Sequence, residues 1–341
     1  MATTSVLRRP SWWRTRSPVA MLWLPLGLLF QALSSIRRLA FRQGWLNSRK
    51  LSAPVIVVGN IAVGGSGKTP VVIWLCEALR RRGYRPGILS RGYGGTARVP
   101  TAVRPDSATA EMGDEPVLLA RRTGCPLWIG ADRAEVGAAL LAAHPEVDIL
   151  VTDDGLQHYR LQRDAEIVVL DEAVLGNLWP MPAGPLREPP CRLGKASLLI
   201  DNGSLSQALL ARLPQRPHAA MQLAPGRFWR LSSPAETCTA DAFATQKVHA
   251  VAGIGHPERF FQTLCSLGLK LASSRGLPDH HALTRADLSV PAGEVLLLTE
   301  KDAVKCPSPA PDNVWVLPVE ARIDDAALDD LLEPLHGSQT A

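Results

Sequence analysis

The chain has 341 residues, of which 46% are hydrophobic and 20% charged, a balance typical of folded globular proteins, and its length favours two domains. Its six cysteines are widely spaced without a C-x-x-C pair, which argues against a disulfide framework or zinc site and predicts buried thiols in a reducing compartment. The net charge of +5 is uneven, because the first 50 residues hold nine of the 37 Lys and Arg residues and none of the 32 Asp and Glu residues. The remaining chain is acidic, which argues against nucleic acid as a partner and predicts attraction of the N-terminal arm to an anionic membrane surface.

The N-terminal arm, residues 1–50, combines its basic residues with an apolar stretch. Residues 18–33 are apolar apart from Gln31, and arginines flank them on both sides. The charge-free run over residues 17–36 is just long enough to cross a hydrocarbon core of about 30 Å, but its prolines weaken a spanning helix. A spanning helix and an arm packed on the protein stay open as alternatives. We expect a helix that lies in the membrane interface.

The most specific local signal runs from Val55 to Thr69. It reads VIVVGNIAVGGSGKT, a β-branched apolar run followed by a glycine-rich loop that ends Gly67-Lys68-Thr69, and an apolar helix pattern follows. Strand, loop and helix in this order predict a phosphate loop, in which backbone N–H groups surround phosphate oxygens, the lysine neutralises them and the threonine reaches Mg²⁺. The general pattern G-x-x-x-x-G-K-[ST] has glycine where this chain has Ala62. The loop residues expected to contact a nucleotide are Gly64, Gly65, Ser66, Gly67, Lys68 and Thr69.

Beyond the phosphate loop, helix and strand patterns alternate. Strands are predicted at residues 88–90, 127–130, 147–152, 165–171 and 196–201, and helices from the loop to about residue 82 and at 117–122 and 132–143. Continuous apolar strands that alternate with helices indicate a parallel sheet covered on both faces. We therefore predict an α/β core over residues 51–220, in which residues 179–190 form a proline-rich loop.

A second, smaller α/β unit is expected over residues 233–341, after an extended connector at residues 221–232. Its strands are predicted at residues 248–253, 269–274, 294–299 and 314–319, and its helices at 257–267 and 324–332. The chain shows no internal repeat of short period.

Carboxylates stand where phosphate transfer would need them. Asp153 and Asp154 close a buried strand pattern, and an aspartate at such a strand end holds Mg²⁺ or its water in phosphate-loop enzymes. Asp114 follows a glycine at the start of a predicted helix, where a carboxylate can cap the helix or orient an incoming hydroxyl group. His280 lies beside Asp279, a pairing that can hold a histidine in one tautomer but also occurs on loop surfaces.

Together these motifs resemble one family, the tetraacyldisaccharide 4′-kinases of Gram-negative bacteria. The matching segments run in order along nearly the whole chain. They are VVGNIAVGGSGKTP (57–70), SRGYGG (90–95), GDEP (113–116), DDGLQH (153–158), RDAEIVVLD (163–171), MPAGPLREP (181–189), AGIGHPERFF (252–261), PDHHAL (278–283) and TEKDAVK (299–305). The loop of this family reads G-N-x-x-V-G-G-[ST]-G-K-T-P, so Ala62 fits the resemblance.

The resemblance implies a kinase that transfers the γ-phosphate of ATP, with Mg²⁺, to the 4′-hydroxyl of an acylated glucosamine disaccharide 1-phosphate, giving lipid IVA. It also implies a RecA-like α/β/α core, a smaller C-terminal α/β/α domain, a two-stranded linker and an N-terminal helix at the cytoplasmic face of the bacterial inner membrane. Another membrane-associated phosphate-loop NTPase is the alternative. A GTP-driven switch is disfavoured because the chain has no N-K-x-D guanine motif.

The resemblance also assigns the nucleotide site. Lys68 and Thr69 would hold the β- and γ-phosphates and Mg²⁺, and Asp153 or Asp154 would complete the metal site. Residues 1–45 would govern membrane association and be dispensable for ATP binding.

For the acceptor side, the resemblance makes Asp114 the base, assisted by His280 when the two domains close. Arg91, Tyr93 and Asn177 would face the headgroup of the lipid substrate. Asp114 and His280 fall in different predicted domains. They can act together only if the fold brings the two domains into contact at these residues.

Overall fold

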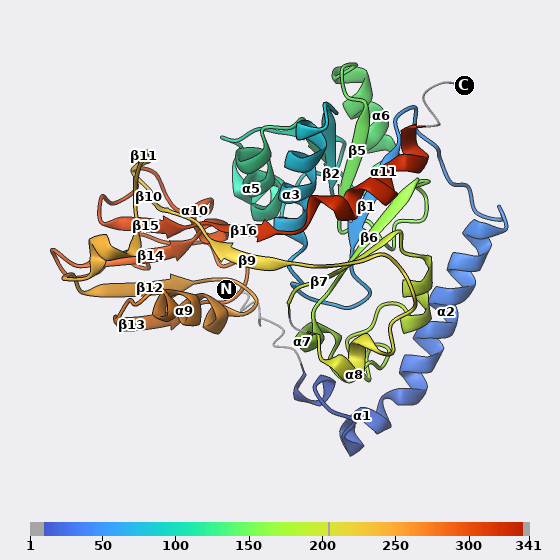
Figure 1. Ribbon diagram of the computed structural model, residues 1–341, viewed down its shortest axis with the longest axis horizontal. Coiled ribbons are helices and arrows are strands. Elements are labelled where there is room, and N and C mark those ends of the chain that lie inside the picture. The colour runs from blue at the N-terminus through green and yellow to red at the C-terminus, as the bar shows by residue number, and fades with distance from the viewer. Residues whose placement is uncertain (1–9, 204, 337–341) are drawn as a thin grey trace.

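A computed structural model describes residues 10–203 and 205–336. In this part of the chain, eight strands form a large sheet, six form a smaller sheet and two form a separate ribbon. Figure 1 shows the smaller sheet to one side of the large body, with the ribbon running between them. The fold is mixed α/β, as the sequence predicts.

The large sheet has the strand order β3-β4-β2-β5-β1-β6-β7-β8, and its neighbouring strands are parallel except β3 with β4. Its strands are β1 (Val55–Gly59), β2 (Pro86–Ser90), β3 (Thr101–Val103), β4 (Leu127–Ile129), β5 (Ile149–Asp153), β6 (Ala165–Leu170), β7 (Leu198–Asp201) and β8 (His218–Ala220). All residues of β1 are buried. Burial on both faces is why the inner strands read as continuous apolar runs.

Helices pack on both faces of the large sheet. α3 (Lys68–Arg81) and α5 (Asp114–Thr123) share one hydrophobic cluster with alternate residues of β1, and α6 (Arg133–Ala143) shares another with the remaining residues of that strand. Strand side chains alternate between faces, so β1 supplies both layers. The shorter helices of this part are α4 (Thr109–Met112), α7 (Glu172–Leu175), η2 (Pro190–Lys195) and α8 (Gln207–Leu210). This layering confirms the predicted α/β core.

The parallel register brings several strand ends together. Val58 of β1 pairs with Asp153 at the end of β5, and Leu89 of β2 pairs with Thr152. The carboxyl ends of β1, β2 and β5 therefore lie at one edge of the sheet, the edge where open α/β sheets bind their ligands. The phosphate loop, the acidic pair and the loop after β2 meet there.

The smaller sheet has the order β11-β10-β15-β14-β12-β13. Its strands are β10 (Phe228–Arg230), β11 (Ser233–Cys238), β12 (Val248–Ala252), β13 (Leu271–Gly276), β14 (Val295–Thr299) and β15 (Val314–Leu317). One face packs against η3 (Ala240–Phe243) and α9 (Pro257–Ser266), and the other packs against residues 277–290. α10 (Glu300–Ala303) follows β14 and contacts α5 of the large body.

The ribbon pairs β9 (Gln222–Pro225) with β16 (Val319–Arg322) and matches the two-stranded linker that the resemblance implies. After β16, η4 (Asp325–Leu328) and α11 (Asp329–His336) pack against the cluster that α3 covers. The described chain thus ends on the large body (Figure 1). The domain boundaries at residues 221 and 233 stay predictions.

At the N-terminus, η1 (Ser11–Trp13), α1 (Pro18–Leu22) and α2 (Leu24–Arg42) lie along the large body (Figure 1). α2 approaches the proline-rich loop at Gly27, where a Cβ atom would lie 2.9 Å from the carbonyl oxygen of Pro180. The exposed large apolar residues of α1, α2 and the residue between them are Val19, Met21, Leu22, Trp23, Leu26, Leu28, Leu29, Leu33, Ile36 and Leu39. Among the described residues, no helix has the length and apolar character that a membrane crossing requires.

Some short elements and one cysteine prediction differ from the sequence analysis. β3, β8, β10 and β11 are unpredicted, because their sequences carry too little apolar pattern to indicate a buried strand. β9 lies in the predicted extended connector, and the strand predicted at residues 314–319 is divided between β15 and β16. The strand predicted at residues 269–274 is shifted to Leu271–Gly276. The buried-thiol prediction holds for Cys76 and Cys125 but is wrong for Cys191 and Cys265, which are exposed.

Candidate active site

The phosphate loop, residues 60–69, connects β1 to α3 in the predicted order of strand, loop and helix. The buried Asn60 side chain organises it, because Nδ2 donates to the carbonyl oxygen of Gly64 at 3.2 Å and to Oγ of Ser66 at 3.0 Å. Nζ of Lys68 lies 3.4 Å from the Gly64 carbonyl oxygen and 3.6 Å from Oδ1 of Asp154. The lysine amine therefore stands between the loop and the acidic pair.

The two adjacent aspartates have opposite electrostatic environments. Asp153 is buried at the end of β5, and burial, followed by the negative charges of Glu115 and Asp154, raises its pKa to about 7. Burial also acts on Asp154, but the charges of Lys68 and Arg187 prevail and lower its pKa to about 2. Asp154 adopts a left-handed backbone conformation with φ of 49°, which is uncommon outside glycine and concentrates at functional sites.

Arg187 is a site residue to which the sequence analysis assigns no role. Its guanidinium contacts both carboxylate oxygens of Asp154, at 3.3 and 3.1 Å, and its Nε donates to the carbonyl oxygen of Ala62 at 3.1 Å. It also contacts Oδ1 of Asn60. The signal was present in the motif MPAGPLREP, whose arginine could have been read as a phosphate-site cation.

Asp114, at the start of α5 on the large body, contacts His280, in the segment that covers one face of the smaller sheet. Nδ1 of His280 lies 2.9 and 3.0 Å from the two carboxylate oxygens of Asp114. Gly113 is required just before, because it has φ of 88° and a Cβ atom there would lie 2.5 Å from the carbonyl oxygen of Tyr93. That close approach brings the loop after β2 onto the start of α5, and the Tyr93 ring lies 5.3 Å from the His280 ring.

A half-buried lysine supports this pair. Nζ of Lys301 lies 2.9 Å from Glu115, 3.1 Å from Asp279 and 3.9 Å from Asp114. Burial acts to raise the pKa of Asp114, but the His280 hydrogen bond and the Lys301 charge together lower it below its ordinary value. The hydrogen bond that His280 donates to Asp114 raises the pKa of His280, although burial opposes the shift. The pair is thus arranged to keep Asp114 ionised and to hold a proton on His280.

The two centres adjoin at the same sheet edge. Ser90, the last residue of β2, donates to Oδ2 of Asp153 at 3.4 Å, and Glu115, which follows Asp114, affects the pKa of Asp153. Arg91 and Tyr93 follow β2 and are exposed, so both are accessible to a ligand. Phosphate donor and hydroxyl acceptor could therefore be held side by side.

Asn177 lies in a different setting. It is buried, and Nδ2 donates to the carbonyl oxygens of Trp12, Thr15 and Ala183 at 3.0 to 3.3 Å. Its Oδ1 accepts from the backbone of Trp179 at 3.0 Å. These bonds favour a structural role, the anchoring of the N-terminal segment, over the predicted contact with substrate.

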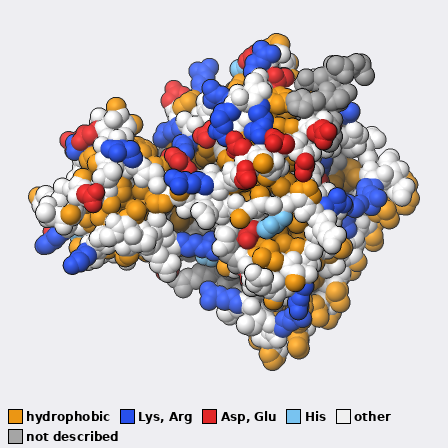
Figure 2. Space-filling view, viewed as in Figure 1, with side chains coloured by type: hydrophobic (Ala, Val, Ile, Leu, Met, Phe, Trp, Pro, Cys, Tyr) orange, Lys and Arg blue, Asp and Glu red, His pale blue; other side chains and the backbone are white. Residues whose placement is uncertain are grey.

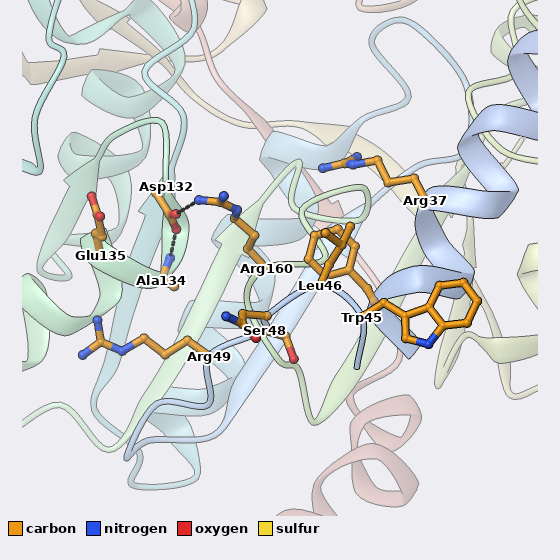
Figure 3. Close-up of a pocket in the computed structure, with 11 residues that line it drawn as sticks. Arg37, Trp45, Leu46, Ser48, Arg49, Asp132, Ala134, Glu135 and Arg160 are labelled. Carbon is orange, nitrogen blue, oxygen red and sulfur yellow. Dashed lines mark hydrogen bonds and ion pairs between the residues drawn. The ribbon is translucent and has the colours of Figure 1, made fainter. Parts of the chain in front are cut away.

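A groove of about 680 Å³ opens between the end of α2 and the start of α6 (Figure 3). Arg37, Arg49 and Arg160 line it from three separate segments, together with Trp45. Arg160 lies 3.0 Å from Asp132. None of the residues predicted to bind nucleotide or transfer phosphate lines this groove.

The residues predicted to hold Mg²⁺ lie at the start of α3 and the end of β5. Among residues 10–203 and 205–336, no group of three or more His, Cys, Asp or Glu side chains could hold a metal ion. The hydroxyl of Thr69 and the carboxylates of Asp153 and Asp154 are hard oxygen donors, which fit Mg²⁺ in combination with phosphate oxygens.

Comparison with known proteins identifies the family. A family model described as Tetraacyldisaccharide-1-P 4′-kinase matches residues 19–336. The chain belongs to the tetraacyldisaccharide 4′-kinase family. It is 51% identical over 336 residues to a tetraacyldisaccharide 4′-kinase of Azoarcus sp. (strain BH72), covering 97% of each chain. It is 52% identical over 333 residues to that of Aromatoleum aromaticum, covering 97% of this chain and 98% of the other.

A solved structure of the tetraacyldisaccharide 4′-kinase family supports the fold. The chain is similar to a crystal structure of the "apo" form of LpxK from Aquifex aeolicus in complex with ATP. The two structures superpose with a TM-score of 0.79 at 28% sequence identity, over 94% of this chain and 99% of that chain. The predicted family and the kinase class are therefore confirmed, and the alternative of another phosphate-loop NTPase is not supported.

Proposed function

We propose that this kinase transfers the γ-phosphate of ATP to the 4′-hydroxyl of a tetraacyldisaccharide 1-phosphate lipid, giving lipid IVA. The chain belongs to the kinase family. The proposal depends most on the pair formed by Asp114 and His280 beside the phosphate loop, in which Nδ1 of His280 lies 2.9 Å from the Asp114 carboxylate. A hydroxyl acceptor needs a proton-handling group at this place, whereas a nucleotide switch does not.

The phosphate loop supplies the donor half of the reaction. Backbone N–H groups of residues 64–67 would surround the β- and γ-phosphates, and Lys68 would neutralise their charge. Thr69 with Asp153 or Asp154 would hold Mg²⁺, which when bound neutralises charge on the phosphate oxygens. Arg187 already contacts Asp154 and the loop, so it would orient both toward the nucleotide.

Asp114 and His280 supply the acceptor half. The oxygen of the 4′-hydroxyl bonds to the γ-phosphorus, the bond to the ADP oxygen breaks, and the hydroxyl proton passes to the Asp114–His280 pair. Lys301 holds the charges around the pair in place through Glu115 and Asp279. Arg91 and Tyr93 would contact the sugar and phosphate groups of the lipid from the loop after β2.

The exposed apolar face of α1 and α2 supports docking on an anionic membrane, and we place it at the cytoplasmic face of the bacterial inner membrane, where ATP is present. Figure 2 shows hydrophobic side chains gathered along the edge where Figure 1 places these helices. Leu22 and Ile36 are 78% and 60% exposed. Arg37 and Arg49 line the neighbouring groove and would meet lipid phosphates.

The experiment that tests this proposal couples ATP consumption to lipid. Purified full-length protein is given ATP and Mg²⁺ with or without the tetraacyldisaccharide 1-phosphate lipid in mixed micelles. We expect ATP consumption to require the lipid and to match the phosphorylated lipid formed, and Asp114→Asn to lower both rates by about 10²- to 10⁴-fold. ATP hydrolysis that proceeds equally without lipid would overturn the proposal.

A further inference from the structure

We propose that Arg38 of α2 is a positioning residue for the phosphate loop. It holds the buried Glu188, and the segment Pro185–Glu188, here called the strap, holds the start of the loop. The inference rests on the proposed role of the phosphate loop in binding ATP. It gives the N-terminal helix a part in nucleotide binding in addition to membrane docking, and so departs from the prediction that residues 1–45 are dispensable for ATP binding.

The first step is the contact between helix and strap. Nη1 of Arg38 lies 3.3 Å from Oε2 of Glu188, whose side chain is only 1% exposed. The same carboxylate accepts from Tyr159 at 2.6 Å and Gln157 at 2.8 Å, and it pairs with Arg192 at 3.2 Å. A carboxylate buried this deeply depends on each partner, because an unpaired charge in the interior is costly.

The second step is the contact between strap and loop. The backbone N–H of Arg187 donates to the carbonyl oxygen of Ile61 at 2.7 Å, and the N–H of Val63 donates to that of Pro185 at 2.9 Å. The Glu188 N–H also donates to the Ile61 carbonyl at 3.3 Å. The strap therefore runs beside the loop and is fastened to it by backbone hydrogen bonds on both sides of Ala62.

The third step reaches the residue that organises the loop. Gln157, which bonds to Glu188, also donates to the carbonyl oxygen of Asn60 at 3.1 Å. Asn60 in turn donates to Gly64 and Ser66. A continuous set of contacts thus extends from Arg38 to the part of the loop that would surround phosphate. Because a pre-organised loop loses less entropy when ATP binds, these contacts should raise ATP affinity.

Arg42 provides a matched control. It lies one turn further along the same helix, carries the same charge and is exposed, whereas the Arg38 side chain is 19% exposed and contacts Glu188. Loss of either arginine removes one positive charge from the membrane-facing arm. Only the loss of Arg38 also removes a partner of the strap.

The experiment compares Arg38→Ala, Arg38→Lys and Arg42→Ala in the full-length protein, in micelles with saturating lipid. Arg38 is one of several partners of Glu188, so we expect Arg38→Ala to raise the KM for ATP and the Kd for ATP about threefold to tenfold. The KM for lipid and binding to anionic vesicles should match those of Arg42→Ala. Arg38→Lys should recover part of the ATP affinity.

A double-mutant cycle provides a second readout, which also serves if Arg38→Ala does not fold. Arg38→Gln and Gln157→Ala should be non-additive in ATP affinity, because both act through Glu188. The inference is overturned if the arginine variants bind ATP as Arg42→Ala does, if only the KM for lipid changes, or if the cycle is additive. Wild-type protein that neither binds ATP nor transfers phosphate would instead refute the proposed function, so the two failures are distinguishable.

Discussion

Replacing Asp114 by asparagine preserves the shape of the side chain but removes the charge that pairs with His280. Both carboxylate oxygens lie within 3.0 Å of Nδ1 of His280, and asparagine offers one oxygen and no charge in their place. Positioned acid–base groups contribute about 10²- to 10⁴-fold to a rate, so we expect kcat to fall within this range. The KM for ATP should stay close to wild type, because the partners of the pair are Asp279, Glu115 and Lys301 rather than the phosphate loop.

The same substitution should shift the pH dependence in a defined direction. The hydrogen bond that His280 donates to Asp114 is the largest cause that raises the pKa of His280. If the rate increases as His280 loses its proton, the wild-type rate rises with pH above the ordinary histidine pKa of about 6.5. Asp114→Asn removes the raising interaction, so the rising limb should move to lower pH.

The assay measures kcat and KM across the neutral pH range for Asp114→Asn, His280→Ala and the double variant. Residues that act as a unit are not additive, so the double variant should lose much less than the two single losses combined. The reasoning is refuted by a pH profile that Asp114→Asn leaves unchanged, or by strict additivity of the two losses.

Three further predictions concern the nucleotide site and the arm. Lys68→Ala should abolish transfer while circular dichroism shows a retained fold, because the lysine neutralises developing charge worth about 3–4 kcal/mol; turnover near wild type would exclude the phosphate loop from the mechanism. Arg187→Lys keeps the charge but loses the planar guanidinium group that contacts both Asp154 and Ala62. Steady-state kinetics should therefore show the KM for ATP rising about tenfold, and an unchanged KM would contradict this. Deletion of residues 1–45 should abolish flotation with anionic vesicles. Salt should weaken vesicle binding by the full-length protein, since each basic residue near the membrane surface contributes about 1 kcal/mol. Full-length protein that does not float with such vesicles at low salt would contradict the role of the N-terminal arm.

The sequence predicts the core because its signals there are local. The run VIVVGNIAVGGSGKT contains a strand, a loop and a helix start, and the structure places β1 and α3 at those residues. Asp153 ends a buried strand, and parallel pairing with β1 then brings it to the loop. These inferences need only neighbouring residues and the geometry of a parallel sheet.

The contact between Asp114 and His280 has no local signal. The residues are 166 positions apart, and only the family resemblance pairs them in the sequence analysis. Arg187 and Asn177 are two further residues whose surroundings the sequence does not report. The sequence analysis assigns no role to Arg187 and a substrate contact to Asn177. Arg187 contacts the phosphate loop through tertiary packing that no periodicity reports, and the amide of Asn177 is directed to the backbone of the N-terminal segment. Residue type alone does not distinguish these two settings.

Two further features depend on contacts between segments distant in the sequence. They are the segment that covers the smaller sheet and the packing of the last helix on the large body. Leu331, Leu332 and Leu335 of α11 pack in the hydrophobic cluster under α3, a contact between segments about 250 residues apart that local sequence does not report. Residues 277–290 cover one face of the smaller sheet without helical structure, so no periodicity marks them as core.

The position of the transferred phosphate on the lipid shows whether the 4′-hydroxyl is the acceptor. Full-length protein is incubated with γ-labelled ATP, Mg²⁺ and the tetraacyldisaccharide 1-phosphate lipid, and the labelled product is fragmented by mass spectrometry. Transfer to the 4′-hydroxyl predicts label at the 4′ position of the distal glucosamine, and labelling about 10²- to 10⁴-fold slower with Asp114→Asn. Label on another hydroxyl group, or label released only as inorganic phosphate, would contradict it.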